Sequence, residues 1–249
     1  MTFNVETFAN DEQKQIRLQL AELLRASNLP NEELIKNLSL FIPWQETMRC
    51  MFIEELYRKQ LEVPGVIMEF GNRWGRNLTL FSTLRASLEP FNHNRKIVGF
   101  DTFKGLTAPA EKDGNSGFAQ EGALATSAGH KQVLEQLLAL HEKGLPYAHV
   151  KKFELVEGDA SVELKKYLAA NPEVVVSLVY FDMDLYEPTK NCLELLQPCL
   201  TQGSVVAFDE INHRSFPGET IALKEVVGLK NVALKRSPLN PLAAYYVQN

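Results

Sequence analysis

The chain has 249 residues, of which 45% are hydrophobic and 23% are charged, a composition typical of a globular protein and not of a disordered one. Its 26 basic and 31 acidic residues give a net charge of −5, which argues against a protein that binds nucleic acid by neutralising phosphates. No segment approaches the ~20 apolar residues that cross a bilayer, and the N-terminus lacks the pattern of a signal peptide. We expect a cytoplasmic protein with neither nucleic-acid nor membrane partners.

The first 62 residues are predicted to be helical. Asp11 can cap a first helix, and Asn31 can start a second helix that ends near Leu38. A third helix is predicted from Trp44 to about Leu61. Because this block has few strand signals, we interpret residues 1–62 as a lid or oligomerisation segment and expect a homo-oligomer.

Short apolar runs alternate with helical stretches in the main domain, residues 63–249. The runs predict buried strands at 66–70, 96–100, 152–156, 174–181 and 204–208. Strands that alternate with helices form mainly parallel sheets with helices on both faces, so we predict an α/β fold. Two further candidates, 231–235 and 243–247, are separated by the turn-rich residues 237–241 and indicate an antiparallel hairpin at the sheet edge.

One long segment interrupts this alternation. Residues 102–129 are rich in Gly, Ala, Ser and Thr and follow a predicted strand end. Loops of this length in compact domains are usually functional or disordered. We interpret this segment as a mobile lid, with a solvated insertion as the alternative.

Acidic residues stand at the ends of the predicted strands: Glu69, Asp101, Asp159, Asp182 and the pair Asp209–Glu210. Parallel strands end at one edge of a sheet, and ligands bind in open α/β sheets at that edge. We therefore expect these carboxylates to gather around a ligand.

The turn after the first strand indicates the kind of ligand. It contains Gly71, but Arg73 stands where the dinucleotide fingerprint needs its second glycine. Glu69 would repel a phosphate and suits an ammonium group, while Asp101 is placed to bind two ribose hydroxyls. A ligand that carries an ammonium group and a ribose without a phosphate is S-adenosylmethionine.

A second group of acids indicates a metal site. Asp182, Asp209 and Glu210 offer three oxygen ligands from two neighbouring strand ends, a set that suits Mg²⁺ or another hard divalent cation. Zinc is disfavoured because one His and no Cys lies nearby. The alternative is that Asp209 caps the following turn and that Glu210 is a surface charge.

A family resemblance is carried by the segments VIMEFGNRWGRNLTLF, FDMDLYEPT and VVAFDEINHRSFPGET. The chain resembles the macrocin O-methyltransferases, which are class I, metal-dependent, S-adenosylmethionine enzymes that methylate sugar hydroxyls. Within them it is most similar to the branch that acts on TDP-deoxysugars. The resemblance runs from about Pro64 to the C-terminus and implies a Rossmann-like sheet of seven strands whose last hairpin is antiparallel.

Matched by position, the resemblance adds roles to the residues found above. The metal ligands would be Asp182, Asp209 and Glu210, and Asp182, Asp184 and His213 are the candidates for catalysis. The residues expected to contact the cofactor are Glu69, Gly71, Arg73, Asn77, Asp101, Thr102, Phe103, Asp159, Ala160 and Asp182.

Two positions depart from the family pattern. The usual Asp-Asp or Asp-Asn pair is Asp209-Glu210 here, and Leu185 stands where catechol-methylating relatives carry a catalytic Lys. The general base is therefore expected to be a carboxylate such as Asp184, or His213.

These observations predict metal-dependent methylation of a sugar hydroxyl, on a nucleotide-activated deoxysugar or on a glycosylated natural product. The metal would lower the pKa of the reacting hydroxyl. A catechol or small-phenol methyltransferase is one alternative, and a non-catalytic nucleoside-binding protein of the same fold is another.

Overall fold

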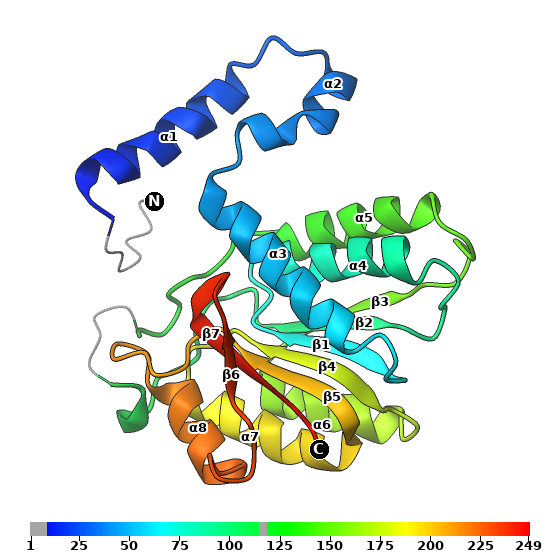
Figure 1. Ribbon diagram of the computed structural model, residues 1–249, viewed down its shortest axis with the longest axis vertical. Coiled ribbons are helices and arrows are strands. Elements are labelled where there is room, and N and C mark those ends of the chain that lie inside the picture. Colours follow the sequence, from blue (N-terminus) through cyan, green and yellow to red (C-terminus); the bar gives the residue numbers. More distant parts are fainter. Residues whose placement is uncertain (1–8, 115–118) are drawn as a thin grey trace. The chain divides into compact units, whose positions relative to one another are not determined.

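Figure 1 shows the computed structural model, which describes residues 9–114 and 119–249. Its contacts divide the chain into two compact units, one that ends at Met51 and one that spans Phe52–Asn249. The first unit contains α1 (Asp11–Arg25), α2 (Asn31–Lys36), the short 3₁₀ helix η1 (Leu38–Leu40) and the first half of α3 (Trp44–Lys59). No residue of α1, α2 or η1 is buried. Residues 115–118 of the predicted lid lie outside the described residues.

The cap of α1 differs from the prediction by one residue. Asn10 and Gln13 form a capping box, in which Gln13 N–H donates to Asn10 Oδ1 at 2.8 Å and Asn10 N–H donates to Gln13 Oε1 at 3.0 Å. Asp11 is the first residue inside the helix, where its charge faces the positive end of the helix dipole. The prediction of Asp11 as the cap was wrong because Asn caps as well as Asp does.

The second unit is built on a seven-stranded sheet with the order β3-β2-β1-β4-β5-β7-β6. Five strands are parallel, whereas β7 runs antiparallel to both β5 and β6. The strand order reverses between β1 and β4, and ligands bind in such sheets at the carboxyl ends beside this switch point. The predicted fold class is confirmed. The strands are β1 (Val66–Phe70), β2 (Ile97–Asp101), β3 (Phe153–Glu157), β4 (Val176–Phe181), β5 (Leu200–Phe208), β6 (Lys235–Ser237) and β7 (Asn240–Val247).

Helices cover both faces of the sheet (Figure 1). Residues 52–59 of α3 pack on one face with α4 (Arg76–Leu88) and α5 (His130–Lys143). The other face carries α6 (Ala160–Ala170), α7 (Tyr186–Leu196) and α8 (Gly218–Val226). No helix in the described part of the chain is long and apolar enough to cross a membrane.

A row of stacked aromatic rings lies beneath the carboxyl edge of the sheet. The rings of Phe100, Phe70, Phe181 and Phe208 stack in that order across β2, β1, β4 and β5, with centroids 4.8, 5.2 and 5.3 Å apart. All four are buried. The row forms an apolar layer below the loops. Stacked rings contribute free energy beyond that gained by burial, so this layer stabilises the edge that carries the loops.

Several elements depart from the sequence prediction. Strand β5 begins at Leu200 and not at 204, and β7 begins at Asn240 and not at 243. Strand β6 begins at Lys235 and not at 231, because a turn in which Asn231 N–H donates to Gly228 O at 3.0 Å occupies the earlier position. Helix α5 was not predicted, although its Leu134 and Leu138 face the core at helical spacing.

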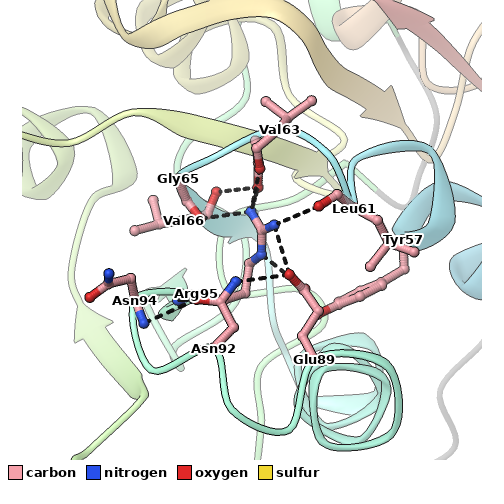
Figure 2. Close-up of polar contacts among 10 residues, drawn as sticks. Tyr57, Leu61, Val63, Gly65, Val66, Glu89, Asn92, Asn94 and Arg95 are labelled. Carbon is pink, nitrogen blue, oxygen red and sulfur yellow. Dashed lines mark hydrogen bonds and ion pairs between the residues drawn. The ribbon is translucent and has the colours of Figure 1, made fainter.

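The amino edge of the sheet is fixed by the buried Arg95 (Figure 2). Its Nη1 donates to the carbonyl oxygens of residues 63 and 65, at 2.9 and 2.8 Å, and to Ser177 Oγ at 2.7 Å. Its Nε and Nη2 hold both oxygens of Glu89 at 3.0 Å. These groups precede β1, begin β4 and follow α4, so one guanidinium joins the strand starts and leaves the opposite edge for a ligand.

Candidate active site

Four loops at the carboxyl edge contain a non-glycine residue in the left-handed region. These residues are Arg73 after β1 (φ 48°), Phe103 after β2 (φ 53°), Asp184 after β4 (φ 63°) and Asn212 after β5 (φ 61°). Backbone of this kind persists where the surroundings hold it in place, and it concentrates at functional sites. The carboxyl edge around the β1–β4 switch point is therefore the candidate active site.

The turn after β1 is packed tightly against the end of β4. Gly71 has φ +88°, and an added Cβ would lie 1.8 Å from the carbonyl oxygen of Asp182. The glycine is therefore required by the neighbouring backbone, a reason that the sequence did not indicate. Glu69 is buried and accepts a hydrogen bond from Asn72 Nδ2 at 2.9 Å. Asn77 is buried in the first turn of α4.

Asp101 joins the loops that follow β1 and β2. Its Oδ2 accepts the N–H of Arg73 and its Oδ1 accepts the N–H of Phe103, both at 2.6 Å. One carboxylate thus fixes two of the left-handed residues. Burial raises the pKa of Asp101, although these hydrogen bonds and the charge of Arg73 oppose the effect. The carboxylate keeps lone-pair capacity beyond these bonds with which it can accept a ribose hydroxyl.

A cavity of about 640 Å³ opens beside the ends of β2 and β3. Thr102 and Asp159 are the predicted cofactor residues that line it, and Asp159 also caps α6 by accepting Val162 N–H at 3.1 Å. The next residue, Ala160, is buried. Phe103 packs instead against the core cluster beneath α3, α4 and α5. The other lining residues, which the sequence did not single out, are Lys104, Thr107, Lys131, Glu163 and 154–158.

The other half of the site is a cluster of acids after β4 and β5. Asp184 is 6% exposed and shares a side-chain hydrogen bond with Glu210. Asp209 accepts a hydrogen bond from the hydroxyl of Tyr180. The positive charge of Arg73 opposes the rise in the pKa of both Asp101 and Asp184. Its guanidinium therefore lies near both halves of the site.

Burial and mutual repulsion change the proton affinity of this cluster. Burial is the largest cause that raises the pKa of Glu210, and the charge of Asp184 raises it further. Burial also raises the pKa of Asp184, against the charges of Arg73 and His213. A hydrogen bond between two carboxyl groups needs a shared proton. The raised pKa values of Asp184 and Glu210 therefore favour a proton held between them, so the pair can offer both an acid and a base.

Glu219, in the first turn of α8, is a site residue that the sequence did not indicate. It is fully buried, and its two oxygens accept the backbone N–H groups of Met183 and Glu210, both at 3.2 Å. Burial raises its pKa, and the charges of the neighbouring acids add to the effect. Acids are common in the first turn of helices because they face the positive end of the dipole, so no feature of the sequence distinguishes this one.

The segment predicted as a lid is held to this half of the site at one point. Asp113 is buried, and its Oδ1 accepts Tyr186 N–H, the first residue of α7, at 2.6 Å. The adjacent Lys112 donates to Tyr186 Oη at 3.0 Å and pairs with Glu225 at 2.6 Å. Residues 112–113 of the segment are therefore bonded to the start of α7, two residues after Asp184.

The carboxylates after β4 and β5 are the kind of ligand that a hard metal ion binds, but their arrangement does not form a metal site. Within residues 9–114 and 119–249, no three His, Cys, Asp or Glu side chains are placed to hold a metal ion. The expected triad of Asp182, Asp209 and Glu210 is thus not preformed in this conformation. However, Glu210 Oε2 is buried and finds no hydrogen-bond partner in the described chain. A hard cation would provide that partner and relieve the repulsion among the acids.

His213 is half-buried in the loop after β5, with its ring against that of Phe216 at 5.6 Å between centroids. Its Nδ1 is buried and has no hydrogen-bond partner among the described residues. Its electrostatic influence on Asp184 places His213 near the acid pair, and its neutral imidazole stays a candidate base. Leu185 is buried at the position that carries Lys in catechol-methylating enzymes, so it supplies no base.

Solved structures relate the chain to known proteins, although no family model and no curated protein matches it. The crystal structure of CalS11, calicheamicin methyltransferase, is 42% identical with a TM-score of 0.95 and covers 99% of this chain and 96% of that chain. The apo structure of CalS11, described as a TDP-rhamnose 3'-O-methyltransferase of calicheamicin biosynthesis, is 41% identical with a TM-score of 0.86 and covers 97% and 96%. The O-methyltransferase NovP is 19% identical with a TM-score of 0.61, covers 81% and 80%, and shares the fold. Identity at this level over nearly the whole of both proteins, together with the seven-stranded sheet, shows that the chain belongs to the macrocin O-methyltransferase family of class I S-adenosylmethionine-dependent methyltransferases.

Proposed function

We propose that the protein transfers the methyl group of S-adenosylmethionine to a hydroxyl of a deoxysugar that is activated as a nucleoside diphosphate. The observation that carries this proposal is the 41% identity, over 97% of the chain, with a TDP-rhamnose 3'-O-methyltransferase. The buried Leu185 supports a sugar over a catechol, because this position offers no lysine base.

In this proposal, one half of the site binds the cofactor and the other half binds the sugar. The loops after β1, β2 and β3 hold the cofactor, with Asp101 on the ribose and Asp159 beside the adenine. The acids after β4 and β5 face the sugar, where Asp184 or His213 takes the hydroxyl proton. The sugar oxygen then attacks the sulfonium methyl carbon as the carbon–sulfur bond breaks, which leaves S-adenosylhomocysteine. The protein's main contribution is to hold the reacting atoms about 3 Å apart.

A divalent cation is part of the proposal. Asp182, Asp209 and Glu210 would hold it, and the buried, unpartnered Glu210 Oε2 supports this assignment. When bound, the cation would lower the pKa of the sugar hydroxyl. Magnesium is the first candidate because every donor is an oxygen.

Mass spectrometry of reaction mixtures tests the function. The purified protein should convert TDP-rhamnose and S-adenosylmethionine to a singly methylated TDP-sugar, whereas free rhamnose and catechol should stay unmethylated. Methylation of catechol, or of a rhamnosylated natural product alone, would reject the nucleotide-sugar assignment.

Chelation tests the cation separately. EDTA should abolish turnover and leave the calorimetric affinity for S-adenosylmethionine unchanged, and added magnesium should restore turnover. Asp209→Asn should behave like chelation and be rescued in part by excess metal. Full activity after exhaustive chelation would remove the cation from the mechanism.

A further inference from the structure

We propose that Glu219 is a positioning residue of the methyl-transfer site, whose carboxyl group fixes the spacing of the β4 and β5 loops and thereby orients Asp184 and Glu210. The role of this pair in acting on the acceptor rests on the proposed function. The clamp itself is a geometric claim that can be tested without a substrate.

The contacts of Glu219 reach the backbone of both loops. Met183 N–H, which Glu219 Oε1 accepts, lies between Asp182 and Asp184. Glu210 N–H, which Glu219 Oε2 accepts, directly follows Asp209. One buried side chain thus bridges two strand ends that are otherwise joined through the sheet.

The first residue of α8, Gly218, is packed tightly against the loop after β4. A Cβ added at Gly218 would lie 2.6 Å from Tyr186 N and 2.7 Å from Asp184 O. It would also lie 2.6 Å from Asp113 Oδ1, the anchor of the lid segment. The residue next to Glu219 therefore touches the backbone of Asp184, whose left-handed φ of 63° must be held by its surroundings.

Glu219 is better suited to this clamp than to stabilising the fold. A fully buried carboxyl group without a cationic partner is costly, and no Lys, Arg or His of the described chain forms an ion pair with Glu219. Its shape, however, matches the task, because two acceptor oxygens face two backbone donors. Gln has the same length but only one acceptor, so its amide N–H₂ would oppose one of the two N–H groups.

The test compares Glu219→Gln with Glu142→Gln. Glu142 is also buried and bridges two groups, since its oxygens accept Arg85 Nη2 at 2.8 Å and Lys152 N–H at 3.0 Å. It belongs to the last turn of α5 and is bonded to Lys152, just before β3, at the amino edge of the sheet and away from the site. Both variants are expected to lose stability. Glu142→Gln also breaks the buried ion pairs with Arg85 and Lys152, so it measures how far a structural loss remote from the site affects turnover.

Hydrogen exchange by NMR should show faster exchange of the Met183 and Glu210 amides in Glu219→Gln, and of the Lys152 amide alone in Glu142→Gln. In steady-state assays, Glu219→Gln should lower kcat at least about 10-fold, as expected for misplaced reacting groups. Its KM for S-adenosylmethionine should stay within about threefold, because the cofactor loops are untouched. Glu142→Gln should keep the kcat of the wild type.

Two results would overturn the inference: unchanged exchange of the Met183 and Glu210 amides, or an equal loss of kcat in both variants. If the wild-type protein methylates no TDP-sugar, the proposed function fails, and the exchange data still decide whether Glu219 clamps the loops.

Discussion

Asp101→Asn is the substitution that most directly tests how the cofactor half of the site is built. The wild-type carboxylate accepts two backbone N–H groups at 2.6 Å, from Arg73 and Phe103. Asn keeps one acceptor oxygen and turns an N–H₂ group toward the other donor, so at least one bond is lost. A hydrogen bond to a charged group contributes about 1.5–3 kcal/mol net. The variant also loses the charged acceptor that we propose for the ribose hydroxyls, a bond made only on binding, so we expect S-adenosylmethionine to bind about 10- to 100-fold more weakly, since about 1.4 kcal/mol corresponds to tenfold.

The assay is isothermal titration calorimetry with S-adenosylmethionine and S-adenosylhomocysteine. Asp113→Asn is the matched control, because Asp113 also accepts two backbone N–H groups, from Ala110 at 2.7 Å and Tyr186 at 2.6 Å, but it is bonded to the start of α7 and does not line the cavity beside β2 and β3. A 2'-deoxy analogue of S-adenosylhomocysteine separates direct from indirect effects. If Asp101 binds the ribose, the variant and the analogue each remove the same interaction. The losses of binding free energy that they cause should then be less than additive.

An affinity of Asp101→Asn within about twofold of the wild type would refute the assignment, given the size of the expected loss. Additive losses would mean that Asp101 shapes the loops without touching the ribose. An equal weakening in Asp113→Asn would show that any lost buried acceptor has the same effect.

Three further outcomes are expected. Arg95→Met should lower the free energy of unfolding in urea by about 3–5 kcal/mol, because it leaves Glu89 buried without its partner. Burial acts to raise the pKa of Glu89, but hydrogen bonds from Arg95 and its neighbours outweigh it and lower the pKa below 4.5. This stability is present above about pH 4.5 and is lost as the pH falls through the lowered value, so the acid-dependent slope should become smaller in Arg95→Met, in which Tyr57 and Asn92 still donate to Glu89. Asp113→Ala should speed hydrogen exchange in residues 106–113 and lower kcat/KM for the sugar, with cofactor affinity unchanged. The double variant Leu23→Ser, Ile35→Ser changes two exposed side chains. It should lower either the oligomer mass measured by light scattering or the turnover. Wild-type values of both would exclude residues 1–51 as an oligomerisation segment and as a lid.

The sequence was sufficient to predict the five parallel strands and the edge of the sheet where the site lies, but it misplaced β6. Val66–Phe70 was predicted with its observed bounds, because an apolar run followed by Gly leaves few alternatives. The acids at the strand ends also lie where a parallel sheet places them. The pattern could not reveal that Gly71 is needed for the carbonyl of Asp182, since that contact joins residues more than a hundred positions apart. Glu219 was missed for the same reason, because its partners belong to two other loops.

The departure at Glu210 has a physical explanation in the register of the sheet. Phe181 of β4 lies opposite Phe208 of β5, so Asp182 and Asp209 are level, and Asp184 stands two residues beyond. A side chain at 210 must cross that offset to meet Asp184, which the longer arm of Glu does. With its N–H held by Glu219, Glu210 has its backbone fixed and its carboxyl group directed to the neighbouring loop. The hydrogen bond from its N–H and the length of its side chain together direct Glu210 toward Asp184, which is how a residue outside the family pattern fits this site.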